Sequence, residues 1–235
     1  MRIALFDYEA GNIHSLAKSL ATDDVEVTIE RDPRRLVDAD AVVLPGVGAF
    51  DAAAARLAPG RDALRAALAD GLPCLGICLG MQLFYEGSEE SALDWGLHRP
   101  SIGREADGSA SLPVDALPPV HPTPGLALLA GSVTRLRARH VPQIGWNELQ
   151  PAGDGDPLLT KSGLDTVYYA NSFVCRVEDE DTVCAWSEHE GDRFAAMVRT
   201  RRVVGVQFHP EKSSVAGVRF VHAWLDEARA ASVAR

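Results

Sequence analysis

The chain has 235 residues, 46% of them hydrophobic, and a formal net charge of −10. This length and apolar content are enough for a sizeable core and predict a single domain over residues 1–235. The acidic balance argues against a nucleic-acid-binding protein, because phosphate binding needs clustered Lys and Arg, and only Arg199, Arg201 and Arg202 form a tight basic group.

The first half of the chain alternates apolar runs with helical patterns. We predict strands at residues 2–6, 25–29, 41–45 and 73–77 and helices at 12–20, 51–58 and 61–71. Strands that alternate with helices imply right-handed crossovers. The fold class is therefore predicted to be α/β with a mostly parallel central sheet.

The second half of the chain consists of short strands with few helices between them. We predict strands within residues 131–138, 167–177, 182–188, 193–200 and 203–208. This pattern favours antiparallel strands that either extend the sheet or form a small flanking one. An amphipathic helix is expected at 214–230.

One segment fits neither half. Residues 99–125 are rich in Pro, Gly, Ser and Ala and have no sustained period. Loops of this length are uncommon inside a compact domain. We expect a surface insertion with weak order.

The N-terminal residues and the cysteines indicate a cytoplasmic protein. Only four apolar residues lie between Arg2 and Asp7, which is too few for the apolar region of a secretory signal, and no stretch is long enough for a membrane span. Four cysteines are present: Cys74, Cys78, Cys175 and Cys184. In a reducing compartment they are expected to be thiols, and their spacing lacks the paired Cys-x-x-Cys of a zinc site, so neither disulfides nor a metal is expected.

Cys78 lies at the centre of Gly76-Ile77-Cys78-Leu79-Gly80, where a strand turns into a helical pattern. This is the spacing of the G-x-S-x-G nucleophile elbow with Cys in place of Ser. The glycines are needed because larger residues would collide with the neighbouring strand and helix. We expect the helix N-terminus to favour a thiolate at Cys78 and Cys74 to be a buried, inert thiol. Close packing around a buried cysteine is the simpler alternative.

Two further motifs supply what a catalytic cysteine needs. In VVGVQFHPEKS, His209 ends an apolar strand and Glu211 follows, which suits a base and the group that orients it. In LPGVGAF, the glycines could present backbone N–H groups to an oxyanion. Alone, each would be a strand-end His or a tight turn. Because all three motifs follow predicted strands, they are expected to meet at the carboxyl edge of the sheet.

These motifs resemble the class I (triad-type) glutamine amidotransferases, and more closely the glutaminase subunits of imidazole glycerol phosphate synthase. The similar blocks are DYEAGNIHSL, LPGVGAF, GICLGMQLFYEGSEE, PQIGWNEL and QFHPEKS, and residues 99–125 lie outside them. PGVGAF and HPEKS discriminate best among relatives. The resemblance implies a flavodoxin-like fold whose mostly parallel sheet is flanked by helices and carries additional antiparallel strands in the second half.

The resemblance implies a glutaminase that needs no cofactor. Cys78 would attack the side-chain amide of L-glutamine, His209 would give a proton to the leaving ammonia, and Glu211 would orient His209. Water would then release L-glutamate from the thioester.

Further residues are assigned by the same resemblance. The oxyanion hole would comprise the Leu79 N–H and an N–H within Gly46, Val47 and Gly48. Gln82 and Glu90 match positions that hold glutamine, although by sequence alone they are ordinary polar residues of an exposed helix face.

The resemblance also implies a partner, a separate (β/α)8-barrel cyclase subunit that receives the ammonia in a heterodimer. The positions matching this contact are Asn12, Trp146, Tyr168 and Lys212. Trp146 and Tyr168 are typical interface anchors, though either could belong to the core.

Two positions depart from the pattern of the family, which commonly has His where this chain has Gln143 and Asn171. The triad is unaffected, so the departures concern the interface and the positioning of glutamine.

Two other functions compete with the glutaminase subunit. An independent Cys-His hydrolase of the same fold, such as a γ-glutamyl hydrolase, would act without a partner, and a non-catalytic binding subunit would not need an intact Cys78, His209 and Glu211.

Overall fold

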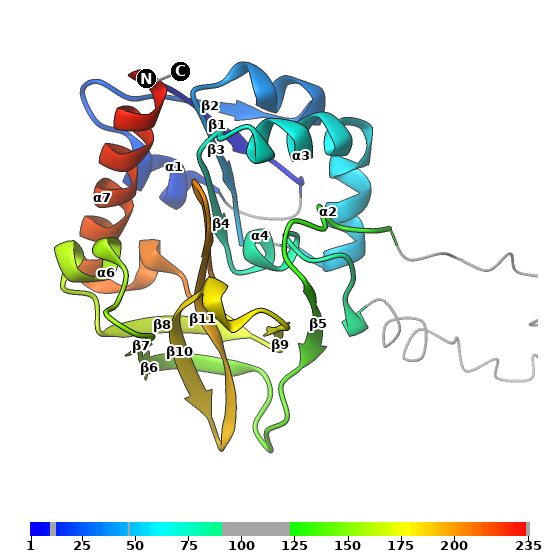
Figure 1. The fold of residues 1–235 in the computed structure, drawn as a ribbon, viewed down its shortest axis with the longest axis vertical. Helices are drawn as coiled ribbons and strands as arrows, with labels where there is room; N and C mark the ends of the chain where they lie inside the picture. Colours follow the sequence, from blue (N-terminus) through cyan, green and yellow to red (C-terminus); the bar gives the residue numbers. More distant parts are fainter. Residues whose placement is uncertain (10–12, 47, 91–122, 234–235) are drawn as a thin grey trace, which may run out of the picture.

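An eight-stranded sheet forms the centre of the fold (Figure 1). A computed structural model describes residues 1–9, 13–46, 48–90 and 123–233. The strands of the sheet, in spatial order, are β2 (Glu26–Glu30), β1 (Arg2–Phe6), β3 (Ala41–Leu44), β4 (Cys74–Ile77), β12 (Val203–Val206), β11 (Asp192–Thr200), β10 (Val183–His189) and β7 (Gln150–Pro151). The first five are parallel and the last three are added antiparallel. With β12 as the fifth strand, the parallel part has the 2-1-3-4-5 order of flavodoxin-like folds.

Strand β1 shows how the sheet divides the core. Ile3 and Leu5 belong to one hydrophobic cluster, Ala4 and Phe6 to another, and none of the four is more than 4% exposed. Successive side chains of a strand point to opposite faces, so the two clusters lie on the two faces of the sheet. Burial on both faces explains why these strands are continuous apolar runs in the sequence.

Helices cover both faces (Figure 1). One face carries α1 (His14–Leu20), α6 (Pro157–Ser162) and α7 (Ser214–Val233), and the other carries α2 (Phe50–Leu57), α3 (Arg61–Ala69) and α4 (Leu79–Gln82). Short 3-10 helices are η1 (Pro33–Asp38), η2 (Ala58–Gly60), η4 (Glu180–Thr182) and η5 (Pro210–Lys212). Within the described residues, none of the helices has both the length and the apolar character that crossing a bilayer requires.

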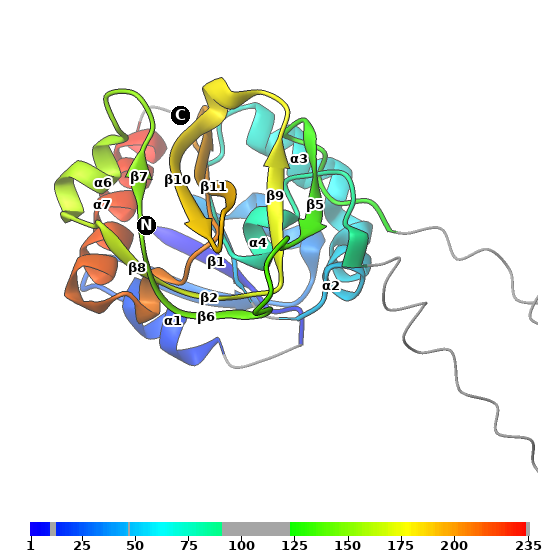
Figure 2. The same cartoon turned by 90° about the horizontal axis from the view of Figure 1, so that it is seen from below.

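Two small antiparallel sheets complete the fold. Strand β5 (Gly131–Arg135) pairs with β9 (Phe173–Val177), and β6 (Gln143–Glu148) pairs with β8 (Thr166–Asn171). The β6–β8 sheet lies across the lower end of the central strands in Figure 1, and Figure 2 shows both small sheets from that side. The β6–β8 sheet therefore lies at the edge of the central sheet where β4 and β12 end.

Most predicted elements are confirmed, with shifts of up to three residues at their ends. One prediction needs correction: residues 203–208 were grouped with antiparallel strands, but β12 pairs parallel with β4 on one side and antiparallel with β11 on the other. A buried strand between two neighbours carries no sequence signal for the direction of each. The stretch 167–177 is two strands, because the chain turns at Ser172 between β8 and β9.

The sequence patterns do not predict strands β6 and β7, helix α6 or the short 3-10 helices. The proposed insertion at 99–125 falls largely outside the described residues. Its last residue, Gly125, is packed into the fold, since its N–H donates to the Glu86 carbonyl oxygen at 2.9 Å and a Cβ there would meet the Leu83 carbonyl oxygen at 2.7 Å.

Asp156 joins α6 and α7 to strand β11. Its carboxylate accepts the Leu158 N–H at 2.8 Å and two hydrogen bonds from Arg199 at 2.6 and 2.9 Å. Arg199 also donates to Glu227 of α7 at 3.1 Å. Burial raises the pKa of Asp156, but the hydrogen bonds and charge of Arg199 outweigh burial and hold the pKa below its usual value. The ionised carboxylate thus ties three elements together.

Asp156→Asn is expected to lower the free energy of unfolding at pH 7 by about 3 kcal/mol, because it leaves Arg199 without its buried counter-charge. Since the folded-state pKa is lowered, this stabilisation is present above the unfolded value of about 3.9 and is lost as the pH falls through the folded-state pKa. Urea unfolding curves of the two proteins should therefore converge in acid. The exposed Asp154→Asn serves as the control. A difference that persists in acid would contradict the ionic explanation.

Candidate active site

Cys78 lies in a strained turn between β4 and α4. Its backbone has φ 48° and ψ −104°, and its N–H donates to the Val206 carbonyl oxygen at 2.6 Å, continuing the ladder between β4 and β12. A positive φ in a residue other than glycine costs about 1–3 kcal/mol and persists only where the surroundings impose it. The side chain of Cys78 is thereby lifted out of the sheet at the carboxyl end of β4, as a nucleophile elbow requires.

Gly76 and Gly80 give this turn its space. A Cβ on Gly76 would lie 2.7 Å from the Gly80 backbone, and a Cβ on Gly80 would overlap the Leu44 carbonyl oxygen. Backbone atoms of packed strands cannot move aside. The prediction that larger residues would collide here is confirmed.

The two thiols of this segment differ in their surroundings. Cys74 is fully buried in β4, and burial raises the pKa of its thiol. Cys78, by contrast, is 7% exposed and stands beside an imidazole. Cys74 therefore has the inert environment that the sequence predicts for it.

His209 follows β12, and the parallel pairing of β12 with β4 places it beside Cys78. Its N–H donates to the Tyr168 carbonyl oxygen at 2.9 Å, and its ring Nδ1 lies 2.8 Å from Glu211 Oε1. Ser213 holds the segment, because its hydroxyl donates to the His209 carbonyl oxygen and accepts the Tyr168 N–H. With Nδ1 bound to Glu211, the other ring nitrogen, Nε2, is the one left for Cys78.

The charge of His209 is set by opposing effects. Burial disfavours the imidazolium, but hydrogen bonds to Cys78 and Glu211, together with their negative charges, outweigh burial and raise the pKa of His209 to about 10. The imidazolium is therefore the stable form of the ring at neutral pH.

Gly46 closes the space between the thiol and the imidazole. A Cβ on Gly46 would lie 2.9 Å from Cys78 Cβ and 3.0 Å from His209 Cε1. Gly48 has φ 105°, a conformation that favours glycine, and Val47 lies outside the described residues. Cys78 and His209 thus leave no room for a side chain at Gly46, which places this loop residue next to both of them.

Comparison with known proteins agrees with this geometry. The family model for glutamine amidotransferase class-I matches residues 4–223. The chain belongs to the class I glutamine amidotransferases. The HisH subunit of imidazole glycerol phosphate synthase from Halobacterium salinarum is 36% identical over 227 residues, covering 95% of this chain and 92% of that protein. HisH from Thermus thermophilus is 35% identical over 223 residues, covering 94% and 95%.

Solved structures show the same fold. The crystal structure of a glutamine amidotransferase covers 97% of this chain and 98% of its own, with a TM-score of 0.63 at 17% identity. PurLQS from Thermotoga maritima gives a TM-score of 0.63 at 17% identity, covering 96% and 98%. The predicted fold class is confirmed, and this chain is a glutamine amidotransferase of the HisH group.

The helix after the nucleophile of this amidotransferase is shorter than its proposed electrostatic role requires. Helix α4 has only four residues, because the N–H groups of Phe84 and Tyr85 bond to carbonyl oxygens three residues back and tighten the chain. One turn carries little of a helix dipole. The helix is therefore a minor source of charge stabilisation at Cys78. The Leu79 N–H, at the first helical position, is among those a helix leaves without an internal acceptor.

Gln82 is connected to the nucleophile through Gln207, a residue that the sequence analysis did not single out. Gln82 Nε2 donates to the Phe173 carbonyl oxygen at 3.1 Å and to Gln207 Oε1 at 3.2 Å, and Gln207 Nε2 donates to Cys78 Sγ at 3.3 Å. No sequence signal distinguishes Gln207, because its partners come from distant parts of the chain. Ser213 has one local partner, His209, and one distant partner, Tyr168, and only the second depends on the fold.

Glu90 is bonded to the start of α2, the helix that follows Gly48. Its Oε2 accepts the N–H of Phe50, the first residue of α2, at 2.8 Å, and its own N–H donates to Ser88 Oγ at 3.1 Å. The carboxylate thus fixes the helix that follows the loop. Its contact with a glutamine substrate stays a prediction.

Gln143 and Asn171, the two departures from the family pattern, face each other across β6 and β8. Both are at most 5% exposed. Asn171 Nδ2 donates at 3.1 Å to the Phe173 carbonyl oxygen, the same oxygen that accepts from Gln82. Gln143 Oε1 and Asn171 Oδ1 have no hydrogen-bond partner in the described part of the chain. Asn171 therefore belongs to the surroundings of Gln82.

The structure brings three of the four expected partner contacts together. Trp146 and Tyr168 lie edge to face with ring centroids 6.0 Å apart, and Lys212 Nζ stands 5.8 Å from the Tyr168 ring centroid. Trp146 is 55% exposed, so it is a surface residue and not part of the core. Asn12 lies outside the described residues. We call Trp146, Tyr168 and Lys212 the aromatic patch.

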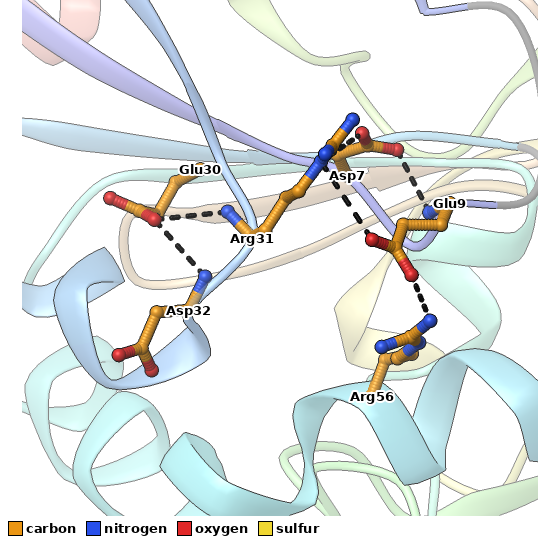
Figure 3. A network of polar contacts seen from close by, with 6 residues as sticks. All are labelled: Asp7, Glu9, Glu30, Arg31, Asp32 and Arg56. Carbon is orange, nitrogen blue, oxygen red and sulfur yellow. Dashed lines mark hydrogen bonds and ion pairs between the residues drawn. The ribbon is translucent and has the colours of Figure 1, made fainter.

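Charged residues connect the neighbouring ends of β1 and β2 to α2 (Figure 3). Arg31 Nε lies 3.0 Å from Asp7 Oδ2 and 3.9 Å from Glu9 Oε1, and Glu9 also pairs with Arg56 of α2. Glu9 has φ 61°, so a strained residue sits at the centre of these pairs. Exposed pairs of this kind add little stability, and they link the β1 end to the helix that follows the Gly46–Gly48 loop.

Proposed function

We propose that this chain hydrolyses L-glutamine to L-glutamate and ammonia through Cys78, His209 and Glu211. It passes the ammonia to a (β/α)8-barrel cyclase subunit of imidazole glycerol phosphate synthase, in histidine biosynthesis. The observation that carries the proposal is the buried contact of Cys78 with the His209–Glu211 pair around Gly46. Membership of the HisH group supports the substrate and the pathway.

The first step is attack on the amide. With His209 holding the proton, the thiolate of Cys78 adds to the side-chain carbonyl carbon of glutamine, and the electron pair of the C=O bond moves to oxygen. The Leu79 N–H and an N–H from residues 46–48 stabilise that oxyanion. Such donors act strongly because they are fixed before the charge develops.

The second step releases ammonia. His209 Nε2 gives its proton to the amide nitrogen, the C–N bond breaks, and ammonia leaves a thioester on Cys78. His209, now neutral, takes a proton from water as the water attacks the thioester carbon. Breaking the C–S bond frees glutamate and restores the thiolate and the imidazolium. Glu211 keeps Nε2 directed at the sulfur throughout.

The aromatic patch supports docking of the cyclase at this edge of the sheet. Tyr168 accepts the His209 N–H with its backbone oxygen, so the patch and the base share one hydrogen bond. An exposed Trp beside a Tyr and a Lys is a typical anchor composition of a protein interface. A partner seated there would shield the ammonia that is released next to His209. An enzyme that transfers ammonia requires such shielding, because free ammonia is lost to water. The cyclase would use it to form imidazole glycerol phosphate and aminoimidazole carboxamide ribotide.

The proposal includes a single domain over residues 1–235 and a cytoplasmic location. The central sheet takes strands from residue 2 to residue 206, so no division of the described chain leaves two complete sheets. A nucleophilic thiol has to stay reduced, which the cytoplasm provides.

Ammonia release from glutamine, assayed with and without the cyclase, tests the proposal. We expect very low activity for the isolated chain and an increase of at least about a hundredfold with the cyclase and its nucleotide ligand, equivalent to roughly 2.7 kcal/mol of barrier. The physical reason is the loop at Gly46 and Gly48, whose backbone can turn its N–H inward or away, and which a partner can bias if it contacts the two arrangements differently.

The other outcomes identify the competing functions. Full turnover by the isolated chain would favour an independent hydrolase. Absence of turnover with every cyclase preparation that is active with ammonium salts would favour a non-catalytic subunit.

A further inference from the structure

Gln207 is a buried polar side chain that touches the sulfur of Cys78. Its residue is 0% exposed, and its backbone N–H donates to the Ala196 carbonyl oxygen of β11 at 2.9 Å. The side-chain Nε2 lies 3.3 Å from Cys78 Sγ, within hydrogen-bond range for sulfur. The Cys78 N–H is bonded to Val206, the preceding residue. Val206, the last residue of β12, therefore holds the backbone of Cys78, and Gln207, which follows that strand, holds its sulfur.

The direction of the Gln207 amide is determined by a carbonyl oxygen two hydrogen bonds away. The Phe173 carbonyl can only accept, so Gln82 must turn its NH2 group toward it. The same NH2 group reaches Gln207, which must therefore present its oxygen to Gln82. That leaves the NH2 group of Gln207 for the sulfur. Flipping Gln207 would set two donors against each other in a buried site, which costs about 1–3 kcal/mol.

A donor aimed at sulfur has a definite chemical effect. An N–H stabilises a thiolate more than a thiol, because hydrogen bonds to charged groups are about twice as strong as neutral ones. The neutral amide neither takes the proton of His209 nor introduces a charge. Helix α4, with a single turn, offers little help of its own.

We propose that Gln207 is a positioning residue of the glutaminase reaction, whose amide N–H holds the Cys78 sulfur as a thiolate and whose orientation is set by Gln82 and Phe173. This inference rests on the proposed role of Cys78 as nucleophile. It assigns to one buried amide the charge stabilisation that the sequence attributes to a helix.

Alkylation of Cys78 by iodoacetamide tests the inference without requiring turnover. Gln207→Met keeps the length of the side chain and removes the donor. At pH 7 its alkylation rate at Cys78, followed by peptide mass spectrometry, should fall about tenfold, because one hydrogen bond to the anion is lost. At a pH high enough that the alkylation rate of each protein no longer rises, the rate of the variant should match that of the unchanged protein. A purely structural role would change both rates alike, or neither, and would overturn the inference.

Matched variants separate orientation from packing. Gln207→Leu also removes the donor, with a branched apolar side chain, so its rate at pH 7 should fall likewise; it also decides the question if Gln207→Met does not fold. Gln82→Met should lower the alkylation rate of Cys78 less than Gln207→Met does. In the double variant it should cause no further decrease, since both residues act through one chain of hydrogen bonds. Additive effects would contradict the relay.

Ser187→Ala is the control for lost buried hydrogen bonds. Ser187 is 0% exposed and bonds to Tyr169 Oη and the Glu148 carbonyl oxygen, each at 2.7 Å. Its substitution should lower stability and leave alkylation at both pH values unchanged.

With the cyclase present, Gln207→Met should lower kcat for glutamine about tenfold with little change in KM, as loss of nucleophile activation predicts. If the unchanged protein has no glutaminase activity, the proposed function fails, while the alkylation rates still decide the role of Gln207.

Discussion

Cys78→Ala is expected to reduce glutamine-dependent synthesis by the complex by at least about four orders of magnitude, the scale of loss when a covalent nucleophile is removed. Synthesis from ammonium salts should remain, because the cyclase then receives ammonia from solution. The structural reason is that the strained backbone at Cys78, its hydrogen bond to Val206 and the glycines around it hold one side chain at the carboxyl end of β4. Nothing else in the described chain can replace a thiol at that point.

The measurement is product formation with each nitrogen source, and Cys74→Ala is the control. Cys74 lies four residues earlier, fully buried, so its loss should change stability and leave glutamine-dependent synthesis largely intact. A glutamine analogue with an electrophilic side-chain carbon should label Cys78 alone, as read from the modified peptide. Labelling of Cys74, or loss of activity in Cys74→Ala only, would assign the nucleophile to the other thiol.

The sequence predicts those parts of the fold and the site whose structure depends on a single segment of the chain. Strands β1, β3 and β4 are continuous apolar runs because helices cover both faces of the sheet. The elbow was visible because Gly76 and Gly80 meet backbone that no side chain can displace. His209 and Glu211 are two residues apart, so their pairing is a local property of one motif.

What the sequence could not predict depends on contacts between distant segments. The direction of β12 relative to β4 decides whether His209 reaches Cys78, and a short apolar strand reads the same in either direction. Gln207 faces the sulfur only because Gln82 and Phe173 orient it. Strand β7 has two residues and no period to detect.

Helix α6 is different, because the sequence does contain signals for its two ends. Asp156 caps it, Pro157 occupies its first turn, and Gly163 ends it with φ 66°. These are standard start and stop residues of a helix. The helix has only six residues, so hydrophobic periodicity could not reveal it while end signals could.

Gly46→Ala is expected to cause a large loss of glutaminase activity, because the added methyl group would meet fixed atoms on several sides. The new Cβ would lie 2.9 Å from Cys78 Cβ, 2.9 Å from the Ile77 carbonyl oxygen and 3.0 Å from His209 Cε1. Ile77 belongs to the β4 ladder, and Cys78 and His209 are both fixed by backbone hydrogen bonds to neighbouring strands. The methyl group must therefore separate the thiol from the imidazole or push the loop at residues 46–48 away from the oxyanion.

Either displacement acts on the transition state more than on folding. Misplacing reacting groups by about 1 Å costs about a hundredfold, and loss of one oxyanion donor costs about a hundredfold to a thousandfold, so we expect about a thousandfold loss of glutaminase activity in the complex. Ammonium-dependent synthesis should persist. Gly87→Ala is the matched control, because a Cβ there meets nothing within 4 Å and the change should be silent. Wild-type glutamine turnover by Gly46→Ala would show that the loop and the Cys78–His209 pair adopt another arrangement during the reaction.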